Sequence, residues 1–464
     1  MSVFRESLLL TGLVCAVAGA VPTSVDAQDA PRTALQTTYR VQAERLIGAA
    51  LADSFAYGRL AELVDNFGHR LSGSESLERA IDWILAEMRK DGVDEVRGEP
   101  VMVPRWVRGA ESVELIEPRR MNLPMLGLGG SIGTPAGGIT AEVLVVNSFE
   151  DLLARAAEAR GKIVVFNVPF TTYGQTVQYR AAGAIAAAKA GAVASLVRSV
   201  ASYSMRTPHT GGMRYDSTVA RIPHAAITVE DAAMLSRMQQ REQRILLRLS
   251  MNAQTHPDSP SRNVVAEIRG SERPDEVVVL GGHIDSWDVG QGAMDDAGGV
   301  VAAWEAIRLM KKLGLRPRRT VRVVGWTNEE NGLRGGTGYR DAHANELGKH
   351  VLAIETDAGV FRPLGYGFTG SDSALAIIRN IAGLLQPIGA DSIASGGGGA
   401  DIGPIMERGV PGMGLNVDGS RYFWFHHSEA DTIDKLDPRD MGLSVATLAV
   451  MAYVVADLPD PLPR

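Results

Sequence analysis

The chain has 464 residues, of which 45% are hydrophobic, with 47 Lys and Arg against 54 Asp and Glu. This composition excludes a disordered protein, and the length predicts two or three domains. No run of basic residues marks a phosphate-binding face, so we expect no nucleic-acid partner.

The first 27 residues have the pattern of a secretory signal peptide. Arg5 precedes an apolar run from Leu8 to Val21, and Val25-Asp26-Ala27 supplies a small-residue cleavage site. The alternative is an N-terminal membrane anchor, but the run is shorter than the roughly 20 residues that a bilayer needs. The only cysteine, Cys15, lies inside this segment. We therefore expect an exported protein, periplasmic or secreted, without disulfides and without a membrane segment after processing.

Helical periodicity covers the chain from about residue 34 to residue 92. In SLERAIDWILAEMRKDG, five apolar residues fall on one helical face and Gly92 is placed to end the helix; the five are Leu77, Ile81, Ile84, Leu85 and Met88. We expect residues 28–114 to form the N-terminal part of the larger domain.

The pattern changes near Met121, where short apolar strands alternate with one helix of small residues. Residues 115–255 are interpreted as an inserted, β-rich domain. His209 and His224 within it have no acidic neighbours at ligand spacing. The next segment, THPDSPSRNVVAEI, contains the proline and serine residues that suit a connection between domains.

Residues 256–464 show strands alternating with helices. EVVVLGGH, RTVRVVGWTNEE and KHVLAIETDAG contain the apolar runs of buried parallel strands, and GGVVAAWEAIRLMKKLG is a helix between the first two. This alternation predicts an α/β domain whose mixed, mainly parallel sheet is flanked by helices. The uncharged run Met441–Ala456 is short for a membrane span and predicts a buried helix.

Histidines and carboxylates follow four of the predicted strands. They are His283 and Asp285 after the first, Glu329 and Glu330 after the second, Asp357 after the third, and His426 and His427 after GVPGMGLNV. Ligands of open α/β sheets bind outside the carboxyl ends of the strands, so these side chains should share one rim. So many carboxylates would repel one another unless cations neutralised them.

The predicted donor set contains histidines and carboxylates but no thiolate. Such a set suits zinc, or less specifically cobalt or manganese. It is larger than one tetrahedral ion needs, so we expect two ions that share a bridging carboxylate.

Four segments in this order resemble the motifs of the co-catalytic zinc exopeptidases, the aminopeptidase and glutamate carboxypeptidase family: HIDSWDVGQGAMDDAGG, WTNEENG, ETDAG and FHHSEADT. The similarity also covers SVASYSMRTPHTGG and IPHAAITVEDAAML, where that family carries a protease-associated insert. The resemblance implies a zinc exopeptidase that hydrolyses dipeptides or short peptides with free termini. Relatives of this kind often form homodimers, and a homodimer is expected here.

The resemblance also implies a role for each residue of the rim. Two Zn²⁺ ions are expected per chain, one bound by His283 and Asp357 and the other by Glu330 and His427, with Asp295 as the bridge. Glu329 would be the general base. Because neighbouring residues at a strand end point in opposite directions, one of Glu329 and Glu330 should be metal-bound and the other free, but only the resemblance says which. Asp285 would orient the imidazole of His283.

Three further residues of these motifs have less definite roles. Asp296 either supports a ligand or caps the following helix, and the cap is favoured. His426 is expected to pack beside the site rather than to bind metal. Asp288 has no assigned role beyond a turn.

Recognition of a peptide terminus would need groups beside the metals. Asp401, in SGGGGADIG, is a candidate for a substrate amine, and Arg421 and Tyr422, in GSRYFWF, are candidates for a substrate carboxylate. A flexible loop and a solvated arginine are the alternatives. Other functions on this fold are a glutaminyl cyclase-like acyltransferase, which uses one zinc, and a receptor-like homologue that has lost ligands; the complete ligand set argues against both.

Overall fold

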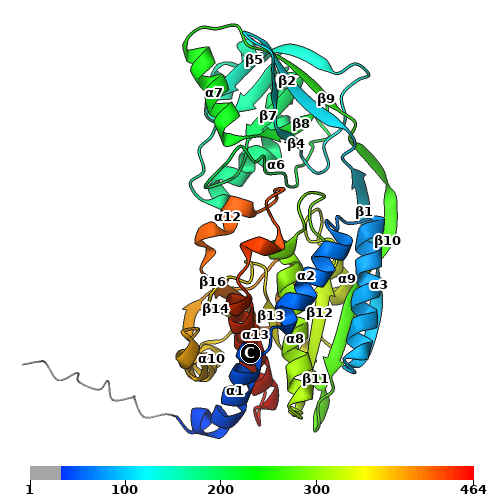
Figure 1. The fold of residues 1–464 in the computed structure, drawn as a ribbon, viewed down its shortest axis with the longest axis vertical. Coiled ribbons are helices and arrows are strands. Elements are labelled where there is room, and N and C mark those ends of the chain that lie inside the picture. Colours follow the sequence, from blue (N-terminus) through cyan, green and yellow to red (C-terminus); the bar gives the residue numbers. More distant parts are fainter. Residues whose placement is uncertain (1–32) are drawn as a thin grey trace, which may run out of the picture.

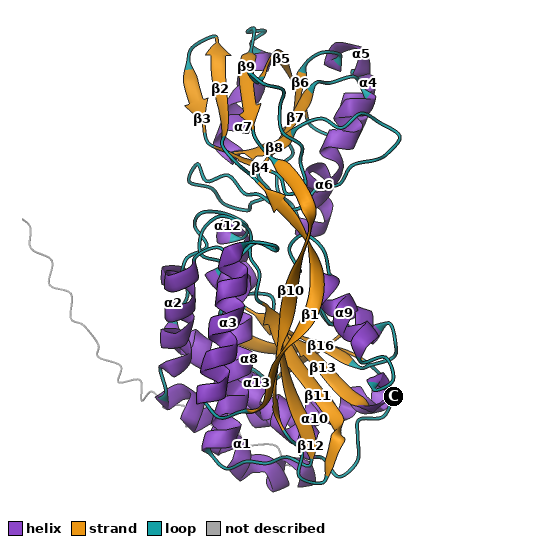
Figure 2. Cartoon of the chain, turned by 90° about the vertical axis from the view of Figure 1, so that its right-hand side faces the viewer, coloured by secondary structure: helices purple, strands orange, loops and turns teal. Residues whose placement is uncertain are grey.

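The computed structural model describes residues 33–464, and the predicted signal peptide, residues 1–27, lies outside this range. The chain forms two lobes, one above the other in Figures 1 and 2. Each lobe is built on an eight-stranded sheet. A twisted two-stranded ribbon, made by β1 (Asp94–Val107) and β10 (Gln254–Ile268), joins them (Figure 2).

The sheet of the larger lobe is mixed, as predicted. Its four central strands, β12, β11, β13 and β16, are parallel to one another. On one side β10 pairs antiparallel with both β12 and β1, and on the other β14 pairs antiparallel with β16. The parallel centre places the carboxyl ends of these four strands at one rim. In spatial order the strands are β1, β10, β12 (Arg319–Trp326), β11 (Arg273–His283), β13 (His350–Glu355), β16 (Gly412–Val417), β14 (Pro363–Thr369) and β15 (Ser392–Ser395).

Helices cover both faces of this sheet, so the apolar residues on each side of its central strands are buried. Val278 and Leu280 of β11 pack in the core of one face, and Val277 and Val279 pack in the core of the other. The first core includes α1 (Ala34–Ala52), α2 (Phe55–Phe67), α3 (Glu75–Lys90), α8 (Gly298–Lys312), α10 (Asp372–Ala382) and α13 (Pro438–Asp457). The second includes α9 (Arg334–Ala342) and α11 (Gly403–Met406).

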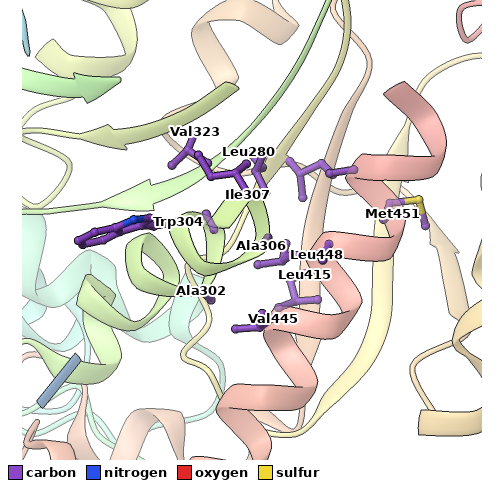
Figure 3. Packing of buried hydrophobic residues seen from close by; sticks show 14 of the residues in the cluster. Leu280, Ala302, Trp304, Ala306, Ile307, Val323, Leu415, Val445, Leu448 and Met451 are labelled. Atoms are coloured by element: carbon purple, nitrogen blue, oxygen red, sulfur yellow. The ribbon is translucent and has the colours of Figure 1, made fainter. Parts of the chain in front are cut away.

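The predicted buried helix near the C-terminus is confirmed as α13. Within residues 33–464 it is the one helix long and apolar enough to cross a membrane, yet 89% of its apolar window is buried in the protein. Figure 3 shows Leu448 of α13 beside Leu415, and Ile307 of α8 beside Leu280 and Val323 of the sheet. The apolar run therefore completes the core of the larger lobe.

The helix predicted around residues 77–92 is confirmed as α3. The hydroxyl of Ser74 accepts a hydrogen bond from the N–H of Leu77 and caps its first turn. The five predicted apolar residues are all buried against the sheet. Gly92 follows the helix with φ +70°, a left-handed conformation that glycine adopts without strain.

The second lobe contains its own mixed sheet and two cores, one on each face. Its strands, in spatial order, are β3 (Met121–Leu123), β2 (Glu111–Glu117), β9 (Leu246–Met251), β5 (Ile139–Val146), β6 (Ile163–Phe166), β7 (Ala194–Arg198), β8 (His224–Ile227) and β4 (Met125–Gly127). Its helices are α4 (Phe149–Ala154), α5 (Ala156–Ala159), α6 (Tyr173–Lys189) and α7 (Val229–Gln240).

The segment THPDSPSRNVVAEI connects the two lobes, as expected, but it does so as strand β10, which pairs with β1 between Gln254 and Glu267. It pairs with β12 only from Val264 onward, so Pro257 and Pro260 lie where the ribbon has a free edge and no second partner needs their N–H groups. One expectation about the second lobe was wrong: besides the single expected helix, α6, the lobe contains α4, α5 and α7, and the hydroxyl of Thr228 caps α7 by accepting from Asp231 N–H.

Candidate metal centre

The rim formed by the carboxyl ends of the parallel strands brings the five predicted ligands together. His283 is the last residue of β11, Asp357 follows β13, and Glu330 follows β12. Asp295 lies in the short segment Ala293–Ala297 that leads into α8. His427 comes after β16, just beyond the single-turn helix α12 (Tyr422–Phe425).

Asp295 lies between the two histidines. Its Oδ1 is 3.1 Å from Nε2 of His283, and its Oδ2 is 3.3 Å from Nε2 of His427. On the first side, Asp357 Oδ1 is 3.4 Å from His283 Nε2. On the second side, Glu330 Oε2 is 3.0 Å from His427 Nε2. One carboxylate therefore presents a separate oxygen to each of two donor groups.

These side chains fit divalent cations by chemistry and by burial. Ligand atoms of His283, Asp295 and Glu330 lie within 4.8 Å of one another, and those of Asp295, His426 and His427 form a second such group. Asp295 Oδ2 and Asp357 Oδ1 are buried and accept no well-aligned hydrogen bond, although each faces an imidazole nitrogen. Because buried polar atoms are nearly always paired, these two atoms point to a missing partner, and imidazole with carboxylate suits zinc.

The electrostatics of the cluster lead to the same conclusion. Burial and the Asp295 charge raise the pKa of Glu330 to about 7. Burial opposes protonation of His427, but Glu330 and Asp295 raise the pKa of its imidazole to about 10. Burial raises the pKa of the Asp357 carboxyl as well. Protons are therefore held in the cluster at neutral pH, and divalent cations would replace them.

Glu329 and Asp285 flank this cluster. Burial, together with the Asp357 and Glu330 charges, raises the pKa of Glu329 well above its ordinary value, which suits a group that must exchange a proton near neutral pH. The Asp285 carboxylate accepts the N–H groups of Glu329 at 3.1 Å and Glu330 at 3.3 Å. His283 Nδ1 is 2.9 Å from the main-chain oxygen of Asp285 and 3.8 Å from its carboxylate. Asp285 thus contacts the imidazole through its carbonyl and holds the two glutamates through its side chain.

Two buried residues that the sequence pattern did not reveal support this rim. The Asp431 carboxylate accepts the N–H groups of Ala293, Met294 and Asp295 and so fixes the segment that carries Asp295. The guanidinium of Arg70 donates to four main-chain oxygens, those of Gly68, Ile284, Gln291 and Gly292. Asp431 lies inside FHHSEADT, so its place in the motif could have identified it. The guanidinium of Arg70 bonds only to main-chain oxygens, so the residue types around it gave no indication of its role.

The three residues with less definite roles have clear contacts. Asp296 accepts from the N–H of Gly299 at 3.1 Å, as a cap of the first turn of α8 does, and also from the N–H of His283 at 3.1 Å. His426 stacks on His427 with ring centroids 3.5 Å apart. Asp288 forms an ion pair with Arg108, with Oδ2 2.9 Å from Nε.

The predicted substrate-binding residues lie at different distances from the cluster. Asp401 is buried, and both of its carboxylate oxygens lack a hydrogen-bond partner. Tyr422 is half-buried with its ring centroid 5.1 Å from that of His426, whereas Arg421 is exposed and lies over the ring of Phe361. Tyr422 therefore contacts the cluster through His426, Asp401 is buried near Glu355, and the exposed Arg421 packs on the buried ring of Phe361.

The second lobe reaches the cluster through the peptide of His426 and His427. The N–H of Thr210 donates to the carbonyl of His427 at 2.8 Å, and His209 Nδ1 lies 2.6 Å from the carbonyl of His426. Nη1 of Arg180 is 3.3 Å from Nδ1 of His427. His427 has φ +59°, which non-glycine residues rarely adopt, so these contacts hold a strained ligand segment in place.

Comparison with known proteins confirms the resemblance. The Peptidase family M28 profile matches residues 263–452. Carboxypeptidase Q of Mus musculus is 51% identical over 92% of this chain and 91% of its own length. The crystal structure of a peptidase M28 precursor from Shewanella amazonensis SB2B matches with a TM-score of 0.89 and 36% identity, over 92% of this chain and 99% of that chain. A zinc aminopeptidase from Bacillus subtilis shares the fold, with a TM-score of 0.64 and 20% identity over 86% of this chain and 93% of that chain. The chain therefore belongs to peptidase family M28, as a relative of carboxypeptidase Q.

Proposed function

We propose that this protein is a zinc-dependent exopeptidase that binds two Zn²⁺ ions and hydrolyses dipeptides or short peptides with free termini. The observation that carries the proposal is the placement of Asp295, whose two oxygens face two separate donor groups. His283 and Asp357 would hold one ion, and Glu330 and His427 the other. The names of the carboxypeptidase Q and M28 relatives support peptide hydrolysis.

The bound ions would supply Lewis-acid chemistry, acidifying a water molecule and polarising the carbonyl of the scissile peptide bond. Glu329 would accept a proton from the attacking water and pass it to the leaving amine, which its raised pKa favours. Asp285 would fix the backbone of Glu329 and Glu330 by accepting both of their N–H groups, so that one side chain binds metal and the other acts as the base.

The domain organisation and localisation are parts of the same proposal. The second lobe would be a protease-associated insert of about residues 115–255 between the two parts of the peptidase domain, residues 28–114 and 256–464. The apolar N-terminal segment would direct export, to the periplasm or the medium. The functional unit would be a homodimer.

A glutaminyl cyclase-like activity and a non-catalytic receptor are less well supported. Cyclisation is proposed to need one ion, whereas Asp295 here faces a histidine on each side, His283 and His427. A receptor that had lost ligands would not keep all five donors on one rim.

Elemental analysis combined with a dipeptide panel tests the proposal. Purified protein dialysed against zinc should contain two zinc ions per chain and hydrolyse dipeptides, and a chelator should abolish the activity until zinc is restored. One zinc per chain with cyclisation of N-terminal glutamine would contradict the proposal, and so would two zinc ions without cleavage of any short peptide.

A further inference from the structure

A cavity of about 210 Å³ opens next to the proposed zinc ligand Asp357. Its wall contains Glu355, Asp357 and the four consecutive glycines Gly396–Gly399. A Cβ at Gly399 would lie 2.0 Å from the carboxylate carbon of Glu355, so only glycine lets the loop run against this side chain. The loop thus leaves an acidic cavity lined mainly by main chain.

Glu355 in the cavity wall, and Asp401 buried near it, lack the partners that buried carboxylates normally have. Glu355 is 2% exposed; its Oε2 accepts the N–H of Ile402 at 2.8 Å, but its Oε1 has no hydrogen-bond partner. Asp401, the residue before Ile402, is 1% exposed and has no partner for either oxygen. Within residues 33–464, neither carboxylate forms an ion pair with Lys, Arg or His.

Unpartnered buried carboxylates are costly unless a ligand completes them. The ligand that fits is a cation with several donors and little bulk, because the unpaired acceptor in the wall is the Glu355 carboxylate and much of the wall is glycine. An ammonium group offers three N–H donors and one positive charge. Asp357 belongs both to the proposed metal centre and to the cavity wall, so a group bound here lies next to the metal centre.

We infer that Glu355 binds the α-ammonium of the substrate's N-terminal residue, with Asp401 as a buried neighbour of the same loop. The inference rests on the proposed function and deepens it. It makes a free N-terminus the feature that the site recognises, whatever name its relatives carry. The bond that is cut is then the one after the first residue.

The test compares ligands that differ only in the ammonium. The best dipeptide substrate is paired with its des-amino analogue, in which hydrogen replaces the amine, and kcat/KM is measured for both with the wild type and Glu355→Gln. We expect the wild type to prefer the dipeptide, and the variant to lose about ten- to a hundredfold of that preference, mostly through KM. Zinc content should be unchanged. Glu407→Gln, at an exposed glutamate after α11, is the matched control and should keep the full preference.

The variant should also fold, because an amide can still accept the N–H of Ile402 and no ion pair is lost. Its melting temperature in the absence of substrate should equal or exceed that of the wild type. Should Glu355→Gln fail to fold, Asp401→Asn takes its place, with a smaller loss of preference expected.

Binding without turnover separates this inference from the proposed function. The thermal shift caused by L-alaninamide should exceed that caused by propionamide in the wild type, and the difference should vanish in Glu355→Gln. If the wild type shows this difference in thermal shift but cleaves no dipeptide, the proposed function is wrong and the inference about Glu355 still holds. An unchanged preference in Glu355→Gln, or equal shifts by the two amides in the wild type, would overturn the inference.

Discussion

Asp295 is the residue on which both halves of the proposed metal centre depend. Replacing it by Asn keeps the shape but removes the charge that would balance two cations. We expect Asp295→Asn to bind no more than one zinc tightly and to lose more than about a hundredfold in kcat/KM. Zinc content after gel filtration and activity on a dipeptide check both effects; full zinc content with full activity would show that Asp295 is not the bridge.

Glu329 should behave differently, because its proposed task is to move a proton. Glu329→Gln should keep both zinc ions and lower kcat by about 10²- to 10⁴-fold, with little effect on substrate affinity. Elemental analysis and steady-state kinetics separate this outcome from loss of metal. Activity equal to that of the wild type would refute its role as the base.

At the level of single residues, the sequence predicted which side chains would meet but not how all of them do so. The five proposed ligands follow strands of a parallel sheet, so the topology predicts that they share one rim, although contacts of Asp431 and Thr210 fix the segments of Asp295 and His427. The contact of His283 with the Asp285 carbonyl, and the carboxylate of Asp285 on two backbone N–H groups, depend on loop geometry that no spacing encodes. Glu355 is the last residue of β13, two positions before Asp357. It was missed because the sequence does not distinguish it from the other acidic residues at the strand ends.

At the level of elements, the loop between β11 and α8 is fixed by hydrogen bonds from buried side chains to its backbone. Arg70 spans it through three of its carbonyl oxygens and anchors it to Gly68. Arg70→Met would leave these buried acceptors unpaired, so we expect a loss of about 3–5 kcal/mol in the free energy of unfolding. Urea unfolding measures it.

Arg45→Met is the control for this substitution. Arg45 is exposed and donates to a single main-chain oxygen, that of Leu313. Its loss should change the free energy of unfolding by no more than about 0.5 kcal/mol. Equal losses in the free energy of unfolding would show that the buried Arg70 contributes no more to stability than an exposed arginine does.

Helical periodicity and continuous apolar runs identified most elements of the larger lobe. Helix α3 was predicted because its apolar residues repeat at helical spacing, and α13 and the central strands were predicted because they are uninterrupted apolar runs. Strand β10 was missed because its prolines and serines suggested a loop, although a two-stranded ribbon tolerates proline at its free edge. Helix α7 was missed because it follows the apolar run of β8 with only Thr228 between them, and that residue is its N-cap.

At the scale of the whole molecule, buried neutral histidines make stability depend on pH. Burial lowers the pKa of His224 in the second lobe and of His350 in the larger lobe to about 4. The unfolded chain binds a proton at each below about pH 6.5, while the folded chain does not until about pH 4. The free energy of unfolding should therefore fall as the pH drops from about 6.5 to about 4, by up to about 3 kcal/mol per histidine.

Urea unfolding of the wild type and of His224→Gln at pH 7 and pH 4.5 checks this dependence. Gln can still bond to Ser195, which lies 2.8 Å from His224 Nδ1, but it does not titrate. The variant should lose about 2–3 kcal/mol less between the two pH values than the wild type does. Equal losses would mean that His224 is not neutral in the folded protein.

The two lobes meet at the segment that carries His427, so the second lobe should influence metal binding. His209→Ala removes the contact to the carbonyl of His426 and leaves that buried oxygen unpaired. We expect about a tenfold weaker affinity for one of the two zinc ions and an unchanged affinity for the other. Zinc titration by calorimetry measures both, and His224→Gln, in the same lobe but away from the interface, should bind like the wild type. Unchanged affinities in His209→Ala would show that the second lobe does not support the site.

The central claim is that two zinc ions share Asp295, and anomalous diffraction at the zinc edge tests it most directly. Crystals of the zinc-loaded protein should show two anomalous peaks, one between Asp295, His283 and Asp357 and the other between Asp295, Glu330 and His427. Crystals of Asp295→Asn grown in the same way should show at most one. A single peak in the wild type, or two peaks that do not both contact Asp295, would contradict the account.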